Sequence, residues 1–298
     1  MLQPLQAVRI YIEMPKFTCY NLAEKKVGDS LEIIFPGFDA RRERVVFLSP
    51  HDDDAVLGAG YLINACRLEA ADAHIVVLCD GRAGYTRPEM KESIVDIRRS
   101  EARLAYAKLG IKKDRIHCFE YPDFSLQAYL GFELTDGTEG VFGKIVKLLR
   151  EIKATRLVIP NGWMEHPDHT AAHEIGAFHG PQVGDPILPD RGTPSKIKSF
   201  VVYPVWGDLP PSQLGCNDAV RADLMMVAPV SFEKKIRKAL ECFKSQSDVI
   251  ADLLCARSGR IRDRKAIEVY KRLVPRPRID YDPYWKAVEN ITTVSAKS

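Results

Sequence analysis

The sequence predicts an α/β fold, with a Rossmann-like, mostly parallel sheet and helices on both faces. From residue 44 onward, short apolar runs alternate with longer segments of helical periodicity. The apolar runs lack the alternation of a half-exposed strand, as expected where both faces of a parallel sheet are covered. A chain of 298 residues, 46% of them hydrophobic, can bury the core of such a domain.

Four strand–helix units follow one another in this region. The first strand is predicted at 44–48, in the run Arg-Val-Val-Phe-Leu, and the first helix at 55–71. Gly110 stands where the glycine that ends a helix is expected. The later elements are strands at 74–79, 115–120 and 156–160 and helices at 92–109, 139–153 and 169–178. Helices between consecutive strands indicate parallel pairing.

The two ends of the chain are expected to differ from this core. Residues 1–43 are predicted to form a short N-terminal β appendage, with β-forming runs at 8–14 and 31–35, and residues 44–298 the main domain. Beyond the loop at 181–197 we expect a further strand at 200–206 and a helical C-terminal region with an amphipathic helix at 231–246.

Composition excludes several classes of function. A net charge of +3 gives no reason to expect a nucleic-acid partner, and no apolar run is long enough to span a membrane. The seven cysteines are scattered without a C-x-x-C pair, and the N-terminus lacks the apolar core of a signal peptide. We therefore expect a cytoplasmic protein that acts on a small molecule, as a monomer or a homo-oligomer.

Polar residues gather where the predicted strands end. His51 and three consecutive aspartates follow the first strand, Asp123 follows the third, and His166-Pro-Asp-His169 follows the fourth. The carboxyl ends of parallel strands meet at one edge of the sheet, so these side chains should lie together. Three adjacent carboxylates repel one another, and burying them without a cation would be costly. The pattern therefore indicates a metal centre rather than a solvated turn.

Two imidazoles and one carboxylate, with a position left open, are typical of a catalytic zinc site. We assign His51, Asp54 and His169 as the ligands. Asp53 would then face the water that zinc activates and serve as the general base.

His166 is better placed to stabilise an oxyanion than to bind the same ion, because Pro167 turns the chain after it. Asp168 would hold the ring of His166 or of a ligand histidine. The alternative for Asp168 is a helix N-cap.

These motifs resemble those of the PIG-L/LmbE-like deacetylases. Ser49-Pro-His-Asp-Asp-Asp-Ala55 is similar to that family's Pro-His-Pro-Asp-Asp-Glu signature. The other matching segments are Leu78-Cys-Asp-Gly81, Arg98-x-x-Glu101, Ala105 to Gly110, Tyr121-Pro-Asp123 and His166-Pro-Asp-His169. The resemblance covers roughly residues 44–180 and continues more loosely to Gln246.

The resemblance implies a Rossmann-like fold and zinc-dependent removal of N-acetyl groups, usually from N-acetylglucosamine-type sugars or their conjugates. It implies the same ligands, base and oxyanion stabiliser, and it makes Arg98 and Asp123 contacts to the sugar. Arg98 could instead form a surface ion pair with Glu101, and Asp123 could serve a turn. Asp52 and Ala55 depart from the signature, which has proline and glutamate there.

Other functions stay open at this point. The same two histidines and carboxylate could hold iron in an oxygenase, and a relative that lost turnover could bind sugar without cleaving it. The nine Lys and Arg of residues 257–278 could bind an anionic substrate group, although a solvated helix face is the simpler expectation. Gly58-x-Gly60 lacks the third glycine of a dinucleotide-binding loop, so we reject that interpretation.

Overall fold

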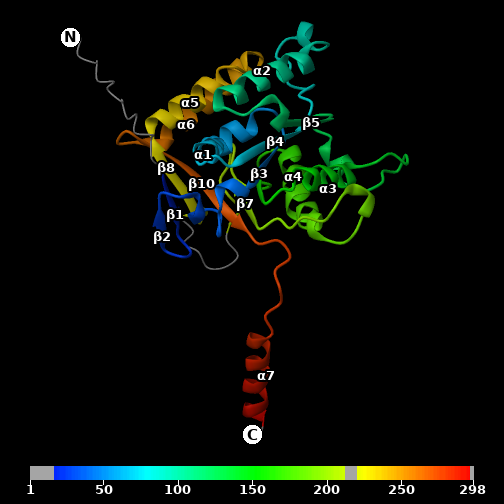
Figure 1. The fold of residues 1–298 in the computed structure, drawn as a ribbon, viewed down its shortest axis with the longest axis vertical. Coiled ribbons are helices and arrows are strands. Elements are labelled where there is room, and N and C mark those ends of the chain that lie inside the picture. The colour runs from blue at the N-terminus through cyan, green and yellow to red at the C-terminus, as the bar shows by residue number, and fades with distance from the viewer. Residues whose placement is uncertain (1–16, 212–219, 296–298) are drawn as a thin grey trace, which may run out of the picture.

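The computed structural model describes residues 17–211 and 220–295. Within these residues ten strands form one sheet in the order β2-β1-β8-β10-β7-β6-β3-β4-β5, with the short β9 paired to β10 (Figure 1). The strands are β1 (Thr18–Asn21), β2 (Lys26–Gly28), β3 (Arg44–Ser49), β4 (Asp72–Cys79), β5 (Ile116–Tyr121), β6 (Arg156–Pro160), β7 (Ser199–Tyr203), β8 (Leu224–Pro229), β9 (Ile261–Arg262) and β10 (Lys265–Leu273).

The part of the sheet from β7 to β5 is parallel, as predicted. β3 pairs with β4 on one side and with β6 on the other, and β5 and β7 extend the sheet outward from these neighbours. The chain therefore leaves the centre in opposite directions at the boundary between β3 and β6. Such a reversal opens a crevice beyond the carboxyl ends of the two strands, where ligands of open α/β sheets bind.

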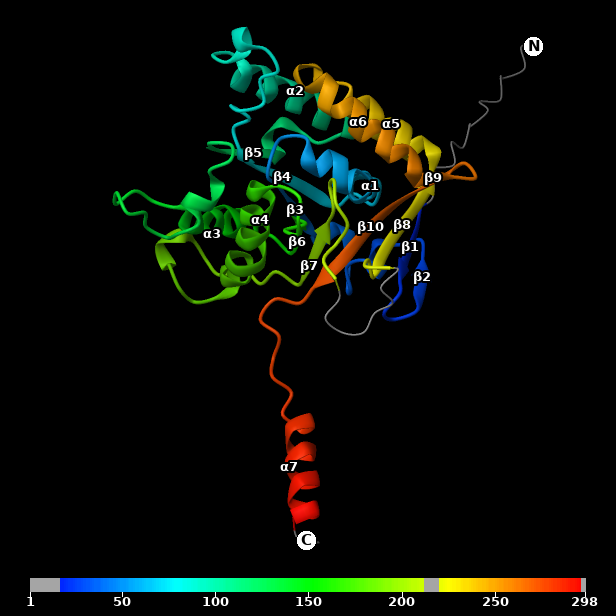
Figure 2. The same cartoon turned by 180° about the vertical axis from the view of Figure 1, so that it is seen from behind.

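Helices cover both faces of the sheet (Figure 2). Along β3, Val45 and Phe47 are buried in a core shared with α1, α2 and α5, whereas Val46 and Leu48 are buried against α3 and α4. This alternation is the period of two expected of a strand. The helices are α1 (Asp54–Leu68), α2 (Ile94–Leu109), α3 (Val141–Ile152), α4 (Pro167–Glu174), α5 (Val230–Leu240), α6 (Ser247–Arg257) and α7 (Asp282–Ser295).

The other half of the sheet is antiparallel and was not expected. β10 pairs antiparallel with both β7 and β8, and β8 pairs antiparallel with β1. The prediction of a helix face within 257–278 is wrong, because half of this stretch forms β9 and β10. From Ala266 to Tyr270 every second residue of β10 is buried, which is the periodicity of a strand, although one of these residues, Glu268, can carry a charge.

The N-terminal segment agrees with the prediction in part. β1 and β2 form an antiparallel pair at the edge of the main sheet, but residues 31–33 form a 3-10 turn rather than a strand. The buried residues Leu31, Ile34 and Phe35 have helical spacing, so the apolar run that predicted a strand has the period of a helical turn. The predicted strand at 8–14 lies outside the described residues, and a domain boundary at residue 43 stays a prediction.

The predicted C-terminal helical region is confirmed. The amphipathic helix predicted at 231–246 is α5, which ends at Leu240, and α7 extends away from the body of the molecule (Figures 1 and 2). Among the described residues, no helix combines the length and the apolar character needed to cross a membrane.

Candidate metal centre and active site

The site lies where the loop after β3 meets the loop after β6. His51 and the three aspartates occupy the turn between β3 and α1, and Asp54 is the first residue of α1. His166 is the N-cap of α4, and Pro167 occupies the first helical position, where its missing N–H costs nothing. His169 follows in the first turn of α4. The two segments therefore face each other across the boundary between β3 and β6.

His51, Asp54 and His169 come together around one carboxylate oxygen. Asp54 Oδ2 lies 3.1 Å from His51 Nδ1 and 3.1 Å from His169 Nε2, and one ligand atom from each residue lies within 4.8 Å of the other two. His169 Nε2 is fully buried and makes no hydrogen bond, because Asp54 is close to it but not aligned. A buried ring nitrogen without a hydrogen bond, beside a carboxylate and a second imidazole, suits a metal ion, and zinc prefers such a donor set.

The charges of these three groups also suit a metal ion. Burial opposes ionisation of Asp54, but the two histidines outweigh it and hold its pKa well below 3.8. Burial likewise opposes protonation of His169, yet Asp54 and Glu165 raise its pKa to about 9. Without a metal, the carboxylate is therefore neutralised by protons on the imidazoles. A divalent cation would take the place of those protons, as is usual when histidines bind metals.

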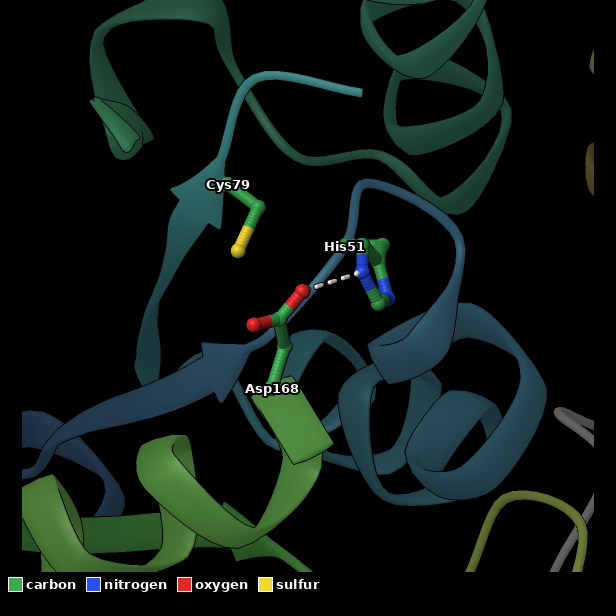
Figure 3. Close-up of side chains that lie close together, drawn as sticks. All are labelled: His51, Cys79 and Asp168. Atoms are coloured by element: carbon green, nitrogen blue, oxygen red, sulfur yellow. Dashed lines mark hydrogen bonds and ion pairs between the residues drawn. The ribbon is translucent and has the colours of Figure 1, made fainter. Parts of the chain in front are cut away.

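Each of the two histidines is held from behind by a carboxylate. His51 Nε2 lies 3.3 Å from Asp168 Oδ2, and His169 Nδ1 lies 2.8 Å from Glu165 Oε2 (Figure 3 for His51). Asp168 is itself fixed, because it accepts hydrogen bonds from the backbone N–H groups of Phe124 (2.6 Å) and Leu126 (3.1 Å). Such contacts orient a metal-binding ring and make its free nitrogen more basic.

Glu165 is the site residue that the sequence analysis missed. Glu165 precedes the N-cap of α4, so helical spacing gave no signal for it, and only its separation of four residues from His169 was available.

A second group of possible ligands shares His51. It consists of His51, Asp168 and Cys79, whose sulfur at the end of β4 faces the Asp168 carboxylate (Figure 3). Burial raises the pKa of the Cys79 thiol, and nearby carboxylates raise it further, so the thiol keeps its proton. Both oxygens of Asp168 already accept backbone hydrogen bonds. The group formed by His51, Asp54 and His169 is the better metal site.

The three consecutive aspartates point to three different partners. Asp54 lies between the histidines, and Asp52 is paired with Arg98, whose Nε lies 3.1 Å from both carboxylate oxygens and whose Nη2 also contacts Oδ1. Asp53 lies 3.8 Å from Arg98 Nη2, beyond hydrogen-bonding distance. Burial raises the pKa of Asp53 to about 7, with Arg98 opposing the shift and the other two aspartates adding to it. A carboxylate with such a pKa suits a general base.

The alternative raised for Arg98, a surface ion pair with Glu101, is wrong. Arg98 is buried with Asp52, and Glu101 accepts hydrogen bonds from the backbone N–H and hydroxyl of Ser245 (2.9 and 2.6 Å). The carboxylate of Asp123 accepts the backbone N–H groups of Gly81 and Ala83 (2.9 and 3.0 Å). Arg98 and Asp123 thus bind other groups of the protein around the site. Contacts from these two residues to a sugar stay predictions.

His166 is held in one tautomer by its position as N-cap. Its Nδ1 accepts the backbone N–H of Asp168 (3.1 Å), so the proton of the neutral ring sits on Nε2. Burial and the nearby His51 lower the pKa of His166 to about 4, and the ring is therefore neutral at pH 7. The N-cap is His166 and not Asp168, which answers the alternative raised for that residue.

A cavity of about 300 Å³ adjoins this centre. Trp206, in the loop after β7, connects the two, because its ring centroid lies 5.5 Å from that of His169 and 6.1 Å from that of His166 and because it lines the cavity. The remaining lining comes from the loop after β7, α1, α6, the turn after α6 and β10, and it includes Arg257 and Arg260. A cavity of this size can enclose a small ligand.

Comparisons with known proteins agree with this architecture. The model of the family described as "PIG-L: GlcNAc-PI de-N-acetylase" matches residues 46–177. A diacetylchitobiose deacetylase of Thermococcus kodakarensis is 29% identical over 138 residues, which are 45% of this chain and 48% of the relative. The aligned region thus spans about half the length of that relative.

Solved structures share the fold at low sequence identity. The N,N'-diacetylchitobiose deacetylase of Pyrococcus horikoshii superposes with a TM-score of 0.61 at 18% identity, covering 79% of this chain and 87% of that one. GalB of Pseudomonas putida, a 4-carboxy-2-hydroxymuconate hydratase, gives a TM-score of 0.57 at 16% identity, covering 80% and 99%. One fold therefore carries different reactions, and the site must decide the chemistry.

The predicted Rossmann-like architecture is confirmed by this likeness. All the ligands and catalytic residues predicted above fall between residues 46 and 177, within the match to the family model. Residues 46–177 of this chain are thus similar to the PIG-L family.

Proposed function

We propose that this protein is a zinc-dependent amidohydrolase that removes the N-acetyl group from an amino sugar of the N-acetylglucosamine type or from its conjugate. The observation that carries the proposal is the division of the site into a ligand set and two free catalytic groups. His51, Asp54 and His169 share one oxygen-centred cluster, while Asp53 and His166 flank it without joining it. The family description and the name of the Thermococcus relative support the substrate class.

Zinc held by the three ligands would polarise the amide carbonyl and lower the pKa of the attacking water. Asp53 accepts a proton from that water as the carbon–oxygen bond forms. The N–H on Nε2 of His166 donates to the carbonyl oxygen as it becomes an oxyanion. Asp53 then returns the proton to the nitrogen as the carbon–nitrogen bond breaks, so the products are acetate and a primary amine.

The features of His166 favour hydrolysis over an iron oxygenase with the same ligands. A neutral ring with its proton fixed on Nε2 is a hydrogen-bond donor at pH 7, which a developing oxyanion requires. The proposed base Asp53 directly precedes the proposed ligand Asp54, so one loop provides both a ligand and the base. The presence of both a ligand and a base in this loop also argues against a protein that binds sugar without cleaving it.

Release of primary amine and acetate from N-acetylated sugars tests the proposal. We expect equal amounts of both products from at least one of N-acetylglucosamine, diacetylchitobiose and N-acetylglucosamine conjugates, with loss on chelation and recovery with zinc. Asp53→Asn should abolish most of the release. Asp80→Asn is the matched control, because Asp80 also follows a strand of this sheet edge but pairs with Arg82. Zinc-independent release, or release unaffected by Asp53→Asn, would refute the mechanism.

A further inference from the structure

The carboxylate of Glu165 connects the metal centre to the loop that carries Trp206. Its side chain is fully buried. One oxygen, Oε2, lies 2.8 Å from His169 Nδ1. The other, Oε1, accepts three consecutive backbone N–H groups of residues 205–207 (3.0, 3.3 and 3.0 Å) and the side-chain amide of Asn161 (3.3 Å). The two oxygens therefore serve two different parts of the site.

The oxygen toward His169 decides which ring nitrogen is free. A carboxylate has no proton to donate, so His169 must keep its proton on Nδ1 and present the lone pair of Nε2. Nε2 is the buried nitrogen without a hydrogen bond that faces Asp54. The tautomer imposed by Glu165 is thus the one that can bind a metal there.

The oxygen toward the loop fixes the wall of the neighbouring cavity. Residues 205–207 line that cavity, and Trp206 within them packs beside the rings of His166 and His169. Three N–H groups converging on one buried oxygen leave this loop little freedom to move away from the centre.

We propose that Glu165 is a positioning residue that prepares His169 for the metal and ties this ligand to the wall of the neighbouring cavity. The inference rests on the metal of the proposed function and adds a residue that acts through His169. Its sharpest consequence concerns Glu165→Gln. Four donors hold the acceptor oxygen of the new amide on the loop side, so its NH₂ group must face His169 Nδ1. That group donates to Nδ1 and moves the ring proton to Nε2, where it blocks the metal.

The two functions of Glu165 can be separated with two variants. Zinc affinity is measured by competition with a chromogenic chelator, and the loop by hydrogen–deuterium exchange of the backbone N–H groups of residues 205–207. For Glu165→Gln we expect a loss of zinc affinity of about 10- to 100-fold with exchange of the loop unchanged. For Glu165→Ala we expect the same loss of affinity together with faster exchange. Asp72→Asn is the control, because Asp72 also pairs with a histidine, His74, away from the centre, and should bind zinc as the wild type does.

The outcomes separate this inference from the proposed function. Unchanged zinc affinity in Glu165→Gln overturns the inference alone, as does equal loop exchange in the Gln and Ala variants. The expected pattern of zinc affinity and exchange, without release of amine from any N-acetylated sugar, refutes the proposed activity and leaves the inference standing. A wild-type chain that binds no zinc overturns the inference together with the metal of the proposed function.

Discussion

The buried pair of Asp52 and Arg98 gives the most quantitative prediction about this site. Asp52 stands where the family signature has proline, and the side chains of Asp52 and Arg98 are at most 9% exposed. Replacing Arg98 with methionine keeps a long apolar side chain but removes the charge. Asp52 is then left buried without its cation, and Asp53 loses the positive charge 3.8 Å away.

The magnitude follows from the distances. At an effective dielectric constant of 20, two unit charges 3.1 Å apart, the distance from Arg98 Nε to the Asp52 carboxylate oxygens, interact with about 5 kcal/mol. Removing one partner of a buried ion pair typically costs about 3–5 kcal/mol. We therefore expect Arg98→Met to lower the free energy of unfolding by about 3–5 kcal/mol. The double variant Asp52→Asn, Arg98→Met should recover at least about 2 kcal/mol of the sum of the single losses.

Urea unfolding of the metal-free protein, followed by circular dichroism, measures these free energies. Arg99→Met is the matched control, because Arg99 lies on the same helix and pairs with the exposed carboxylates of Asp96 and Glu120. It should cost no more than about 1 kcal/mol. A loss below about 1 kcal/mol for Arg98→Met, or strictly additive effects in the double variant, would contradict the role given to this pair.

Two further predictions concern the packing behind the site. Burial raises the pKa of Glu268 from 4.5 to about 7, so between these values the folded protein keeps a proton that the unfolded chain has lost. The free energy of unfolding should therefore fall as pH rises from 4.5 to 7, by up to about 3 kcal/mol relative to Glu268→Gln, in urea unfolding across this range. If both proteins show the same pH dependence, Glu268 does not carry this proton. Gly58→Ala would place a Cβ 2.5 Å from the carbonyl oxygen of Pro204, which should lower stability by about 1–3 kcal/mol. Gly259→Ala, whose Cβ meets nothing within 4 Å, is its control in thermal unfolding, and equal stability of the two variants would refute the packing argument.

The parallel half of the fold could be predicted because its signal is local. The run at 44–48 is apolar at every position after Arg44, and helix patterns separate it from the next strands. The antiparallel half could not, because β10 reads as a charged segment. Its buried Glu268 accepts hydrogen bonds from the backbone N–H of Tyr61 and the hydroxyl of Tyr270, and it lies 3.7 and 3.5 Å from the guanidinium groups of Arg257 and Arg260. The contacts with Tyr61, Arg257 and Arg260 form only once segments distant in the sequence are packed together.

The site likewise contains residues that the sequence could predict and contacts that it could not. Strand ends brought His51, Asp54 and His169 to one edge on general topological grounds, and the structure places them within reach of one ion. The partners behind them were harder to foresee. The pairing of Asp52 with Arg98 joins residues 46 positions apart, and Glu165 contacts a loop 40 positions away. Such contacts depend on the orientation of α2 and of the loop after β7, which no local pattern encodes.

The turnover of Asp53→Asn loaded with its full amount of zinc tests the central claim most directly. Asp53 is proposed as the base and not as a ligand, so the variant should retain the zinc content and affinity of the wild type. Its kcat for release of primary amine should fall by about 10²- to 10⁴-fold. A rate within tenfold of the wild type, at equal zinc content, would contradict the account, and so would loss of the metal itself.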